Sequence, residues 1–277
     1  MLPDIQASRD DRNLRVDEAG VTGVRYPVAV ADREHGKQDT IAEVRMSVDV
    51  SPDVKGTHLS RLIEVLHENA GEITPRVMPA ILDRLRSRLG ARTARLELSF
   101  PFFARRVAPV TGATALLDYQ CWLAGELIGA DAQVVLGVRV PVTSVCPCSK
   151  AISDYGAHNQ RATITIYALP RSEERVPAGV SAEDLIEVAE TACSCPVFPL
   201  LKRPDERHVT MRAYDHPVFV EDMARAAAQA LSDDHRIAWF SVEAASEESI
   251  HNHGAFARIS SSASAGDIWS ARLRGIS

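Results

Sequence analysis

The feature that most constrains the fold is a two-residue alternation of apolar and polar side chains that recurs along the chain. Between residues 134 and 142 every second side chain is aliphatic. A period of two is typical of β-strands with one buried face. Strands are therefore predicted at 24–30, 44–50, 94–100, 117–123, 134–142, 162–166, 237–242 and 255–259.

Helical patterns separate these strands. They predict four helices, which begin near Thr57, Thr74, Ser181 and Asp215. Thr74 is the expected N-cap of the second, with Pro75 at its first position and Gly90 as its stop. Ser181 and Asp184 form the capping-box pattern of the third.

The order strand-strand-helix-helix-strand-strand thus occurs twice, joined near residue 130. Short links between strands favour antiparallel sheets with helices on one face, an α+β architecture. The predicted organisation is an N-terminal arm (1–20), a first unit (21–130) and a second unit (131–277).

Composition excludes several classes of protein. With 45% hydrophobic and 25% charged residues, the chain is not a disordered polymer, a collagen or a coiled-coil rod. A formal net charge of −6 argues against a nucleic-acid partner, although an anionic small molecule needs only a few local cations. The first twenty residues carry no secretory pattern, and no apolar run approaches the ~18–20 residues that span a bilayer. A cytoplasmic protein without a membrane partner is expected.

The cysteines point to metal or thiolate chemistry. There are five, an odd number that does not suggest a disulfide framework. Cys121 stands alone in an apolar segment and is expected to be a core thiol. The others form two tight pairs, Cys146 with Cys148 and Cys193 with Cys195.

The first pair lies in the most informative segment of the chain. Cys146, Cys148 and His158 fall within thirteen residues, directly after the strongest predicted strand. A thiolate and an imidazole suit Zn²⁺ or a similar ion, and a second thiol can act as a nucleophile. The alternative is a structural zinc site made of both cysteine pairs, but it leaves His158 unexplained. Cys193 and Cys195 are otherwise expected to be core thiols at a helix end.

The same segment carries a family resemblance. VTSVCPCSK (142–150) and YGAHNQR (155–161) resemble the signature of the type IB GTP cyclohydrolases, a prokaryotic alternative form of the first enzyme of folate biosynthesis. Further matches follow in consistent order at 56–61, 200–206, 219–222 and 247–253. The resemblance implies the tunnelling fold, with two tandem units per chain, each a four-stranded antiparallel sheet with two helices on one face. It also implies a homotetramer with active sites at subunit interfaces.

The resemblance implies a role for individual residues. The residues that match the metal ligands are Cys146, His158 and Glu206, and the ion would be one divalent metal per site, zinc, manganese or iron. Cys148 resembles the catalytic thiol, and Glu248 and His251 the proton-handling pair. Glu221 resembles the purine-anchoring carboxylate, although its place on a helical wheel predicts exposure. Candidate cations for the triphosphate are His58, Arg61, Lys150, Arg161, Lys202 and Arg203.

The activity that the resemblance implies is conversion of GTP and water to 7,8-dihydroneopterin triphosphate and formate. Two alternatives remain open from the residues alone. One is another enzyme of the same fold that acts on a pteridine or deazapurine, such as a nitrile-forming reductase. The other is a non-enzymatic protein with a structural zinc site of four cysteines.

Overall fold

The chain divides into two compact units. Three long strands each contribute residues to both units: β3 (Thr93–Val107), β4 (Thr114–Ile128) and β5 (Asp131–Val145). The computed structural model describes residues 3–171 and 179–261. One unit comprises the chain up to Pro101 together with Trp122–Leu136. The other comprises Phe102–Cys121 and the chain from Gly137 onward.

In the first unit the strand order is β1-β2-β3-β4-β5, with β1 at Val16–Asp32 and β2 at Gly36–Val50. Both β1/β2 and β2/β3 are antiparallel, and Val44 pairs with Leu98. Gly36 begins β2 with a φ of 79°, a conformation that glycine adopts without steric cost. The alternation seen in the sequence places a row of aliphatic side chains in the core: Val44, Met46, Val48, Leu96 and Leu98.

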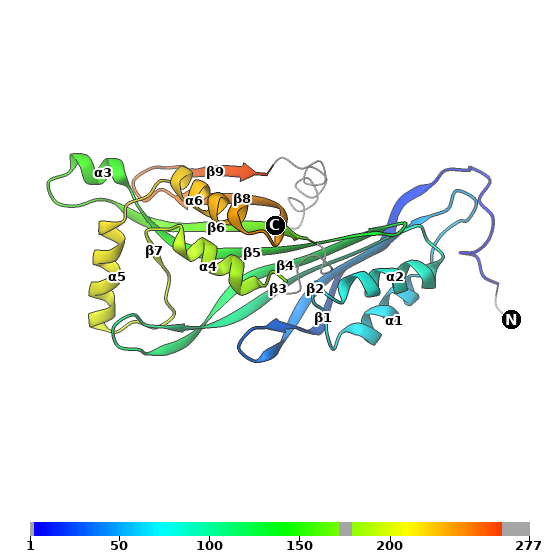
Figure 1. Ribbon diagram of the computed structural model, residues 1–277. Helices are drawn as coiled ribbons and strands as arrows, with labels where there is room; N and C mark the ends of the chain where they lie inside the picture. Colours follow the sequence, from blue (N-terminus) through cyan, green and yellow to red (C-terminus); the bar gives the residue numbers. More distant parts are fainter. Residues whose placement is uncertain (1–2, 172–178, 262–277) are drawn as a thin grey trace. The chain divides into compact units, whose positions relative to one another are not determined.

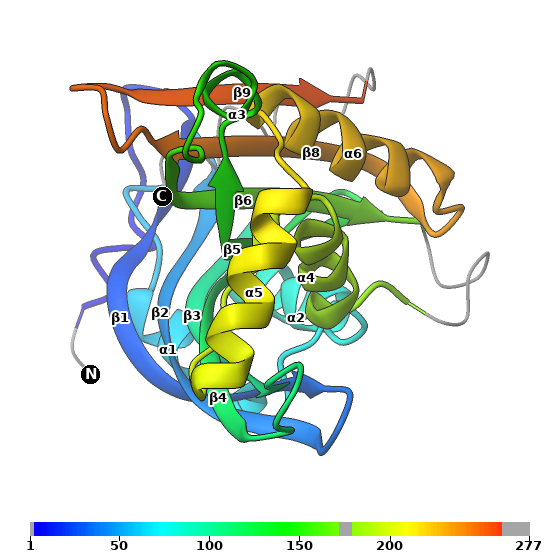
Figure 2. The ribbon, with the colours of Figure 1, turned by 90° about the vertical axis from the view of Figure 1, so that its left-hand side faces the viewer.

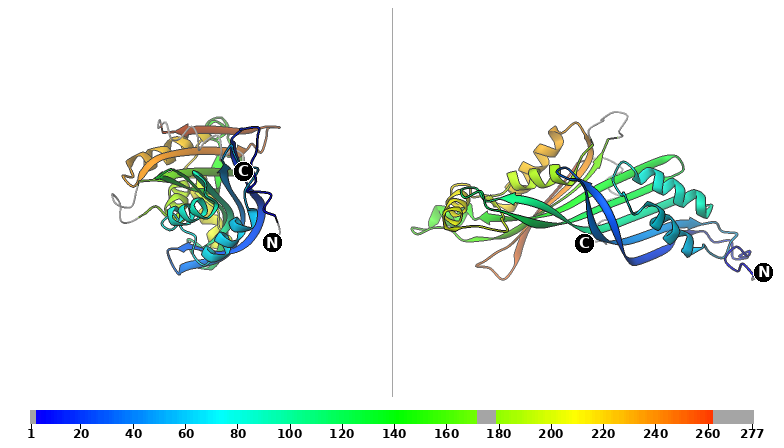
Figure 3. Two further views of the ribbon diagram at one scale, coloured as in Figure 1. Left: turned by 90° about the vertical axis from the view of Figure 1, so that its right-hand side faces the viewer. Right: turned by 90° about the horizontal axis from the view of Figure 1, so that it is seen from below.

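Helices α1 (Leu59–Asn69) and α2 (Met78–Leu89) of this unit lie side by side (Figures 1 and 3). The predicted stop is confirmed, because Gly90 caps α2 in the left-handed conformation and its N–H bonds to carbonyls of the last turn. The predicted start at Pro75 is wrong. Residues 75–77 form a turn instead, in which the Val77 N–H donates to the Thr74 carbonyl (3.2 Å), so the helix starts at Met78.

In the second unit the order is β3-β4-β5-β6-β8-β9, and the short strand β7 (Cys195–Pro196) pairs with β5. Strand β6 (Asn159–Pro170) runs antiparallel to β8 (Ile237–Glu247), which in turn pairs with β9 (Gly254–Ser260). Helices α4 (Ala182–Thr191) and α6 (Val220–Asp233) pack on each other and against these strands (Figure 2).

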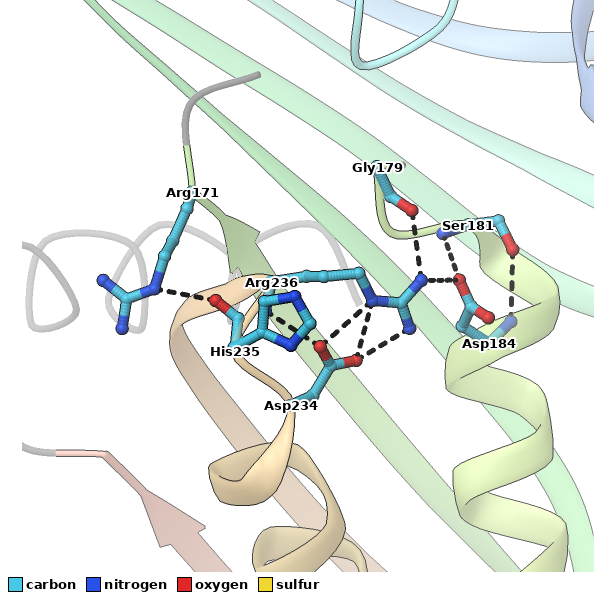
Figure 4. Close-up of polar contacts among 7 residues, drawn as sticks. All are labelled: Arg171, Gly179, Ser181, Asp184, Asp234, His235 and Arg236. Carbon is cyan, nitrogen blue, oxygen red and sulfur yellow. Dashed lines mark hydrogen bonds and ion pairs between the residues drawn. The ribbon is translucent and has the colours of Figure 1, made fainter. Parts of the chain in front are cut away.

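Arg236 joins the start of α4 to the turn before β8 (Figure 4). Its guanidinium contacts the carboxylates of Asp234 at 2.7 Å and Asp184 at 3.2 Å. These partners, Asp234 foremost, raise the pKa of Arg236 despite the opposing effect of burial. The predicted capping box is confirmed, since Ser181 and Asp184 each bond to the other's backbone N–H.

Two helices of the described residues were not predicted from the sequence, α3 (Pro147–Ile152) and α5 (Arg203–Asp215). Helix α5 buries only Asp205 and Ala213, so it has no apolar stripe that a periodicity could reveal. The helix predicted from Asp215 begins at Val220 instead, because Asp215 ends α5.

The α+β prediction is confirmed by the antiparallel strands and the helices packed against them. Strand β1 begins at Val16, inside the stretch predicted to be an N-terminal arm. None of the helices in the described ranges has the length and apolar character needed to cross a bilayer.

Candidate active site

The Cys-Pro-Cys sequence ends β5 and starts α3. Cys146 is the N-cap residue of α3, and its Sγ accepts a hydrogen bond from the Ser149 N–H (3.4 Å). Pro147 fits the first helical turn, where its missing N–H costs no helical hydrogen bond. No side chain of this helix is buried, and Cys148 is exposed. The two thiols therefore differ in environment although one residue separates them.

The chain then returns to α3 and brings His158 beside Cys146. The Cys146 N–H donates to the His158 carbonyl (3.1 Å), and the His158 N–H donates to Ser149 Oγ (3.2 Å). Gly156, in the returning loop, has a φ of 151°, which favours glycine. The proposed thiol and imidazole ligands are thus held on adjacent backbone segments.

His158 belongs to a polar cluster with Gln160, Ser246 and Glu248. Its Nδ1 lies 2.8 Å from Gln160 Oε1, and Gln160 Nε2 donates to Glu248 Oε1 at 3.3 Å. Glu248 Oε1 also accepts from Ser246 Oγ at 2.6 Å, and its other oxygen is 3.9 Å from His158 Nδ1. Antiparallel pairing of β6 with β8 creates the cluster, since Ala162 lies opposite Ser246.

Two further histidines adjoin this cluster in the turn between β8 and β9. The His251 ring meets the His158 ring edge to face, with centroids 6.3 Å apart. The His253 ring stacks on His251 at 5.1 Å. Both are exposed, so the turn presents two imidazoles to solvent next to the ring of His158.

Lys150 and Arg161 flank the same region. Lys150 Nζ donates to the Tyr214 carbonyl at 2.5 Å and lies 4.2 Å from the centre of the Tyr214 ring. This contact attaches α3 to the C-terminal end of α5. Arg161 is exposed on β6.

The start of α5 carries three exposed side chains: Lys202 at the N-cap, and Arg203 and Glu206 in the first turn. Glu206 precedes Tyr214 by eight residues, which corresponds to about 12 Å along a helix axis. Within residues 3–171 and 179–261, no three His, Cys, Asp or Glu side chains come together in a group that could hold a metal ion. Glu206 is thus not grouped with Cys146 and His158 in the single chain.

The position of this turn is fixed by buried Asp205. Its carboxylate accepts hydrogen bonds from the backbone N–H groups of Val110, Thr111 and Lys202 (2.8–2.9 Å) and from the Thr111 hydroxyl (2.6 Å). Burial raises the pKa of Asp205, but these hydrogen bonds outweigh it and hold the pKa below its usual range.

A groove of about 650 Å³ runs along α5. Four of its lining residues carry basic side chains: Arg207, His208, Arg212 and His216. Its two arginines, Arg207 and Arg212, add cations to those proposed from the sequence.

Glu221 is exposed in the first turn of α6, as the helical wheel predicts. The chain just before this turn is bound to the end of β5, because the Val218 N–H donates to the Val145 carbonyl (3.1 Å). Val145 directly precedes Cys146. The segments that carry Glu221 and Cys146 therefore meet at this point.

His58 and Arg61 belong to the first unit. His58 is the N-cap residue of α1, and its Nε2 lies 3.2 Å from Asp4 Oδ2. Arg61 donates to the Arg88 carbonyl (3.3 Å). The other predicted site residues belong to the second unit.

The remaining cysteines are core thiols, as predicted. Cys121, Cys193 and Cys195 are buried. Burial raises the pKa of each thiol, to about 12 for Cys193. The arrangement gives no support to a structural site of four cysteines, since the second pair is buried in the core and no three cysteines come together within residues 3–171 and 179–261.

Sequence analysis missed Gln160 and Ser246. A signal for Gln160 did exist: it falls on the same face of β6 as buried Ala162, Ile164 and Ile166. A polar side chain on an apolar face needs a partner. That partner, Glu248, is 88 residues away in the sequence, so no local pattern could name it.

Comparison with known proteins places this chain in a family. The family model described as type I GTP cyclohydrolase folE2 matches residues 2–257. The chain belongs to the FolE2 family. The GTP cyclohydrolase FolE2 of Magnetococcus marinus is 46% identical over 258 residues, covering 93% of this chain and 95% of the relative. That of Nitrosococcus oceani is 44% identical over 258 residues, covering 93% and 94%.

This FolE2 family member is also similar to solved structures, but only in its fold. The uricase of Arthrobacter globiformis superposes with a TM-score of 0.53 at 9% identity, covering 91% of this chain and 97% of the uricase. A uricase from Bacillus fastidious gives a TM-score of 0.55 at 9% identity, covering 88% and 92%. The expected tunnelling fold is consistent with this likeness.

The depressed pKa of Asp205 predicts a pH-dependent contribution to stability. The carboxylate stabilises the fold above its unfolded pKa of about 3.9, and this stabilisation is lost as the pH falls toward the lower folded value. Asp205→Asn should therefore lower the midpoint of thermal unfolding at neutral pH. The amide nitrogen of the new side chain would point its N–H groups at backbone N–H groups that now donate to the carboxylate. The exposed Asp118→Asn on β4 is the control and should leave the midpoint unchanged. A deficit of Asp205→Asn that stays constant as the pH falls below about 4 would contradict this account.

Proposed function

We propose that this chain, as a member of the FolE2 family, is a GTP cyclohydrolase that converts GTP and water to 7,8-dihydroneopterin triphosphate and formate. This reaction is the first step of folate biosynthesis. The observation that carries the proposal is the meeting of the family signature residues at one end of β6 and β8. There Cys146 adjoins His158, and His158 adjoins Glu248 and His251.

A divalent metal, zinc, manganese or iron, is proposed at Cys146 and His158. The donors fit, since a thiolate and a neutral imidazole are ligands that such ions accept. Gln160 occupies Nδ1 of His158, which leaves Nε2 on the far side of the ring for an ion. When bound, the ion supplies Lewis acidity and activates water for attack on C8 of guanine.

The third proposed ligand, Glu206, is assigned to a neighbouring copy of the chain. Support comes from its position in the first turn of α5, whereas the C-terminal end of α5 contacts α3. A site completed by a second copy agrees with the homotetramer and interface active sites that the family implies.

The remaining chemistry falls to side chains around this point. Cys148, exposed on α3, is the proposed nucleophilic thiol. Glu248 and His251 are proposed to move protons at the purine nitrogens and the ribose. Ser246 and Gln160 hold Glu248 in place, and the stacked His253 supports the His251 ring.

The substrate is proposed to be held at both ends. Glu221 would accept from N1–H and the 2-amino group of guanine, a charge-assisted pair of contacts that adenine cannot make. The triphosphate would meet the basic side chains predicted from the sequence, supplemented by Arg207 and Arg212 in the groove of α5. Adjoining copies would cover Glu221, which is exposed in the single chain.

The assembly is proposed as a cytoplasmic homotetramer. Residues 21–130 and 131–277 would each form a tunnelling-fold unit of four antiparallel strands with two helices on one face. The likeness to the uricase fold supports the proposal of tunnelling-fold units.

Metal content and turnover should separate the roles of the cysteines. With metal, the chain should produce a GTP-dependent rise in pterin fluorescence. Cys146→Ala and His158→Ala should lose both metal and turnover, because each removes a ligand atom. Cys148→Ser should keep the metal and lose most turnover, since a hydroxyl is a much poorer nucleophile than a thiolate.

The control is Cys193→Ala, which changes a core thiol and should keep metal and turnover. Release of metal from Cys193→Ala and Cys148→Ser as readily as from Cys146→Ala would favour the four-cysteine site instead. Failure of the metal-loaded chain to release formate from GTP would refute the proposed function.

The assignment of Glu206 to a second copy can be tested by mixing. Chains with Cys146→Ala and chains with Glu206→Gln, co-expressed and isolated as mixed oligomers through two different tags, should regain activity that neither variant has alone. Random pairing would leave about one quarter of the sites with a full ligand set. If both ligands come from the same chain, every site carries a defect and no activity returns.

The role of Glu221 predicts a large kinetic effect at an exposed position. Glu221→Gln should lower kcat/KM for GTP roughly 100-fold or more. One acceptor oxygen of the carboxylate becomes an N–H donor, which would then face an N–H donor of guanine. Metal content and oligomer size should stay unchanged. Glu187→Gln, on the exposed side of α4, is the matched control and should change the activation free energy by less than about 0.5 kcal/mol. Near-normal kinetics for Glu221→Gln would mean that Glu221 is only a solvated helix residue.

A further inference from the structure

We propose that Gln160 is a positioning residue that fixes the tautomer of His158 and the orientation of Glu248 at the same time. Gln160 is 8% exposed and lies near the start of β6, on the face that buries Ala162 and Ile164. A buried carboxamide is costly unless its donors and acceptor are used. Here both of its ends have partners from the candidate site.

The two ends of the carboxamide cannot be exchanged. Glu248 as a carboxylate only accepts hydrogen bonds, so the amide nitrogen must face it, as it does at 3.3 Å. The amide oxygen then faces His158 Nδ1 at 2.8 Å. An oxygen there only accepts, so Nδ1 must carry the proton and donate.

This places the lone pair of neutral His158 on Nε2, the ring atom directed away from Gln160. Hydrogen bonding at one imidazole nitrogen commonly sets which nitrogen is free to bind. The role of Nε2 as a metal ligand rests on the proposed function. The tautomer itself rests only on the hydrogen bonds of Gln160. Ser246 completes the arrangement, since its hydroxyl donates to the same Glu248 oxygen that Gln160 contacts.

Two substitutions separate the two contacts of Gln160. Gln160→Met keeps the length of the side chain and removes both contacts. Gln160→Glu keeps an acceptor toward His158 but replaces the donor toward Glu248 by a second acceptor, which repels it. The matched control is Gln229→Met on α6, where an exposed glutamine donates to Asp233.

The measurement is the nitrogen NMR spectrum of histidine-labelled full chain, freed of metal and held at a pH where the ring is neutral. Metal must be absent because a bound ion would itself select the tautomer. The wild type should show His158 protonated at Nδ1. Gln160→Met should shift the tautomer ratio toward Nε2–H by roughly 2- to 10-fold, the effect of one net hydrogen bond. Gln160→Glu should keep the Nδ1–H form yet lower kcat, and Gln229→Met should change neither.

A wild-type His158 protonated at Nε2 would overturn the proposal, and that measurement needs no variant. An unchanged tautomer in Gln160→Met would also overturn it and leave Gln160 as a residue of structural importance only. Absence of turnover in the wild-type enzyme would count against the proposed function, whereas the tautomer result would stand independently.

Discussion

The register between β6 and β8 is the constraint on which the candidate site depends. Ala162 lies opposite Ser246, so the start of one strand meets the end of the other. His158 and Gln160 therefore reach Glu248, although 88 residues separate Gln160 from that carboxylate in the sequence. A slip of one residue would turn Gln160 to the opposite face of the sheet and break every contact of the cluster. The buried apolar residues of β6 resist such a slip, because it would expose them together.

Local signals in the sequence were enough to predict most of this scaffold. The alternation at 134–142 and 162–166 reports directly on β5 and β6, because each side chain's face follows from its position alone. The stop at Gly90 and the capping box of Ser181 with Asp184 are also local, and both were predicted. Helix α5 was missed because long-range contacts position it: Asp205 binds Val110 and Thr111, some 94 residues earlier.

The same distinction between local signals and long-range contacts applies to the candidate site. Cys146, Cys148 and His158 are close in sequence, so their common loop was predictable from spacing. Their proposed roles came from the family resemblance, since spacing alone left a four-cysteine zinc site open. Gln160 was visible only as a polar neighbour of His158, because its function depends on Glu248 across the sheet. The exposure of Glu221 in the single chain was predicted correctly from the helical wheel.

The unequal burial of the thiols has a consequence for oxidative damage. Cys121, Cys193 and Cys195 are packed in the core with raised pKa values, so they carry little thiolate and are shielded from peroxides. Cys148 lies in the open on a short helix with no buried side chain. An oxidant in solution therefore meets the loop of the candidate active site before it reaches any thiol that supports the core. Oxidation of Cys148 would remove the proposed nucleophile while the core stays intact, and a cellular reductant can reverse such damage at the sulfenic acid or disulfide stage.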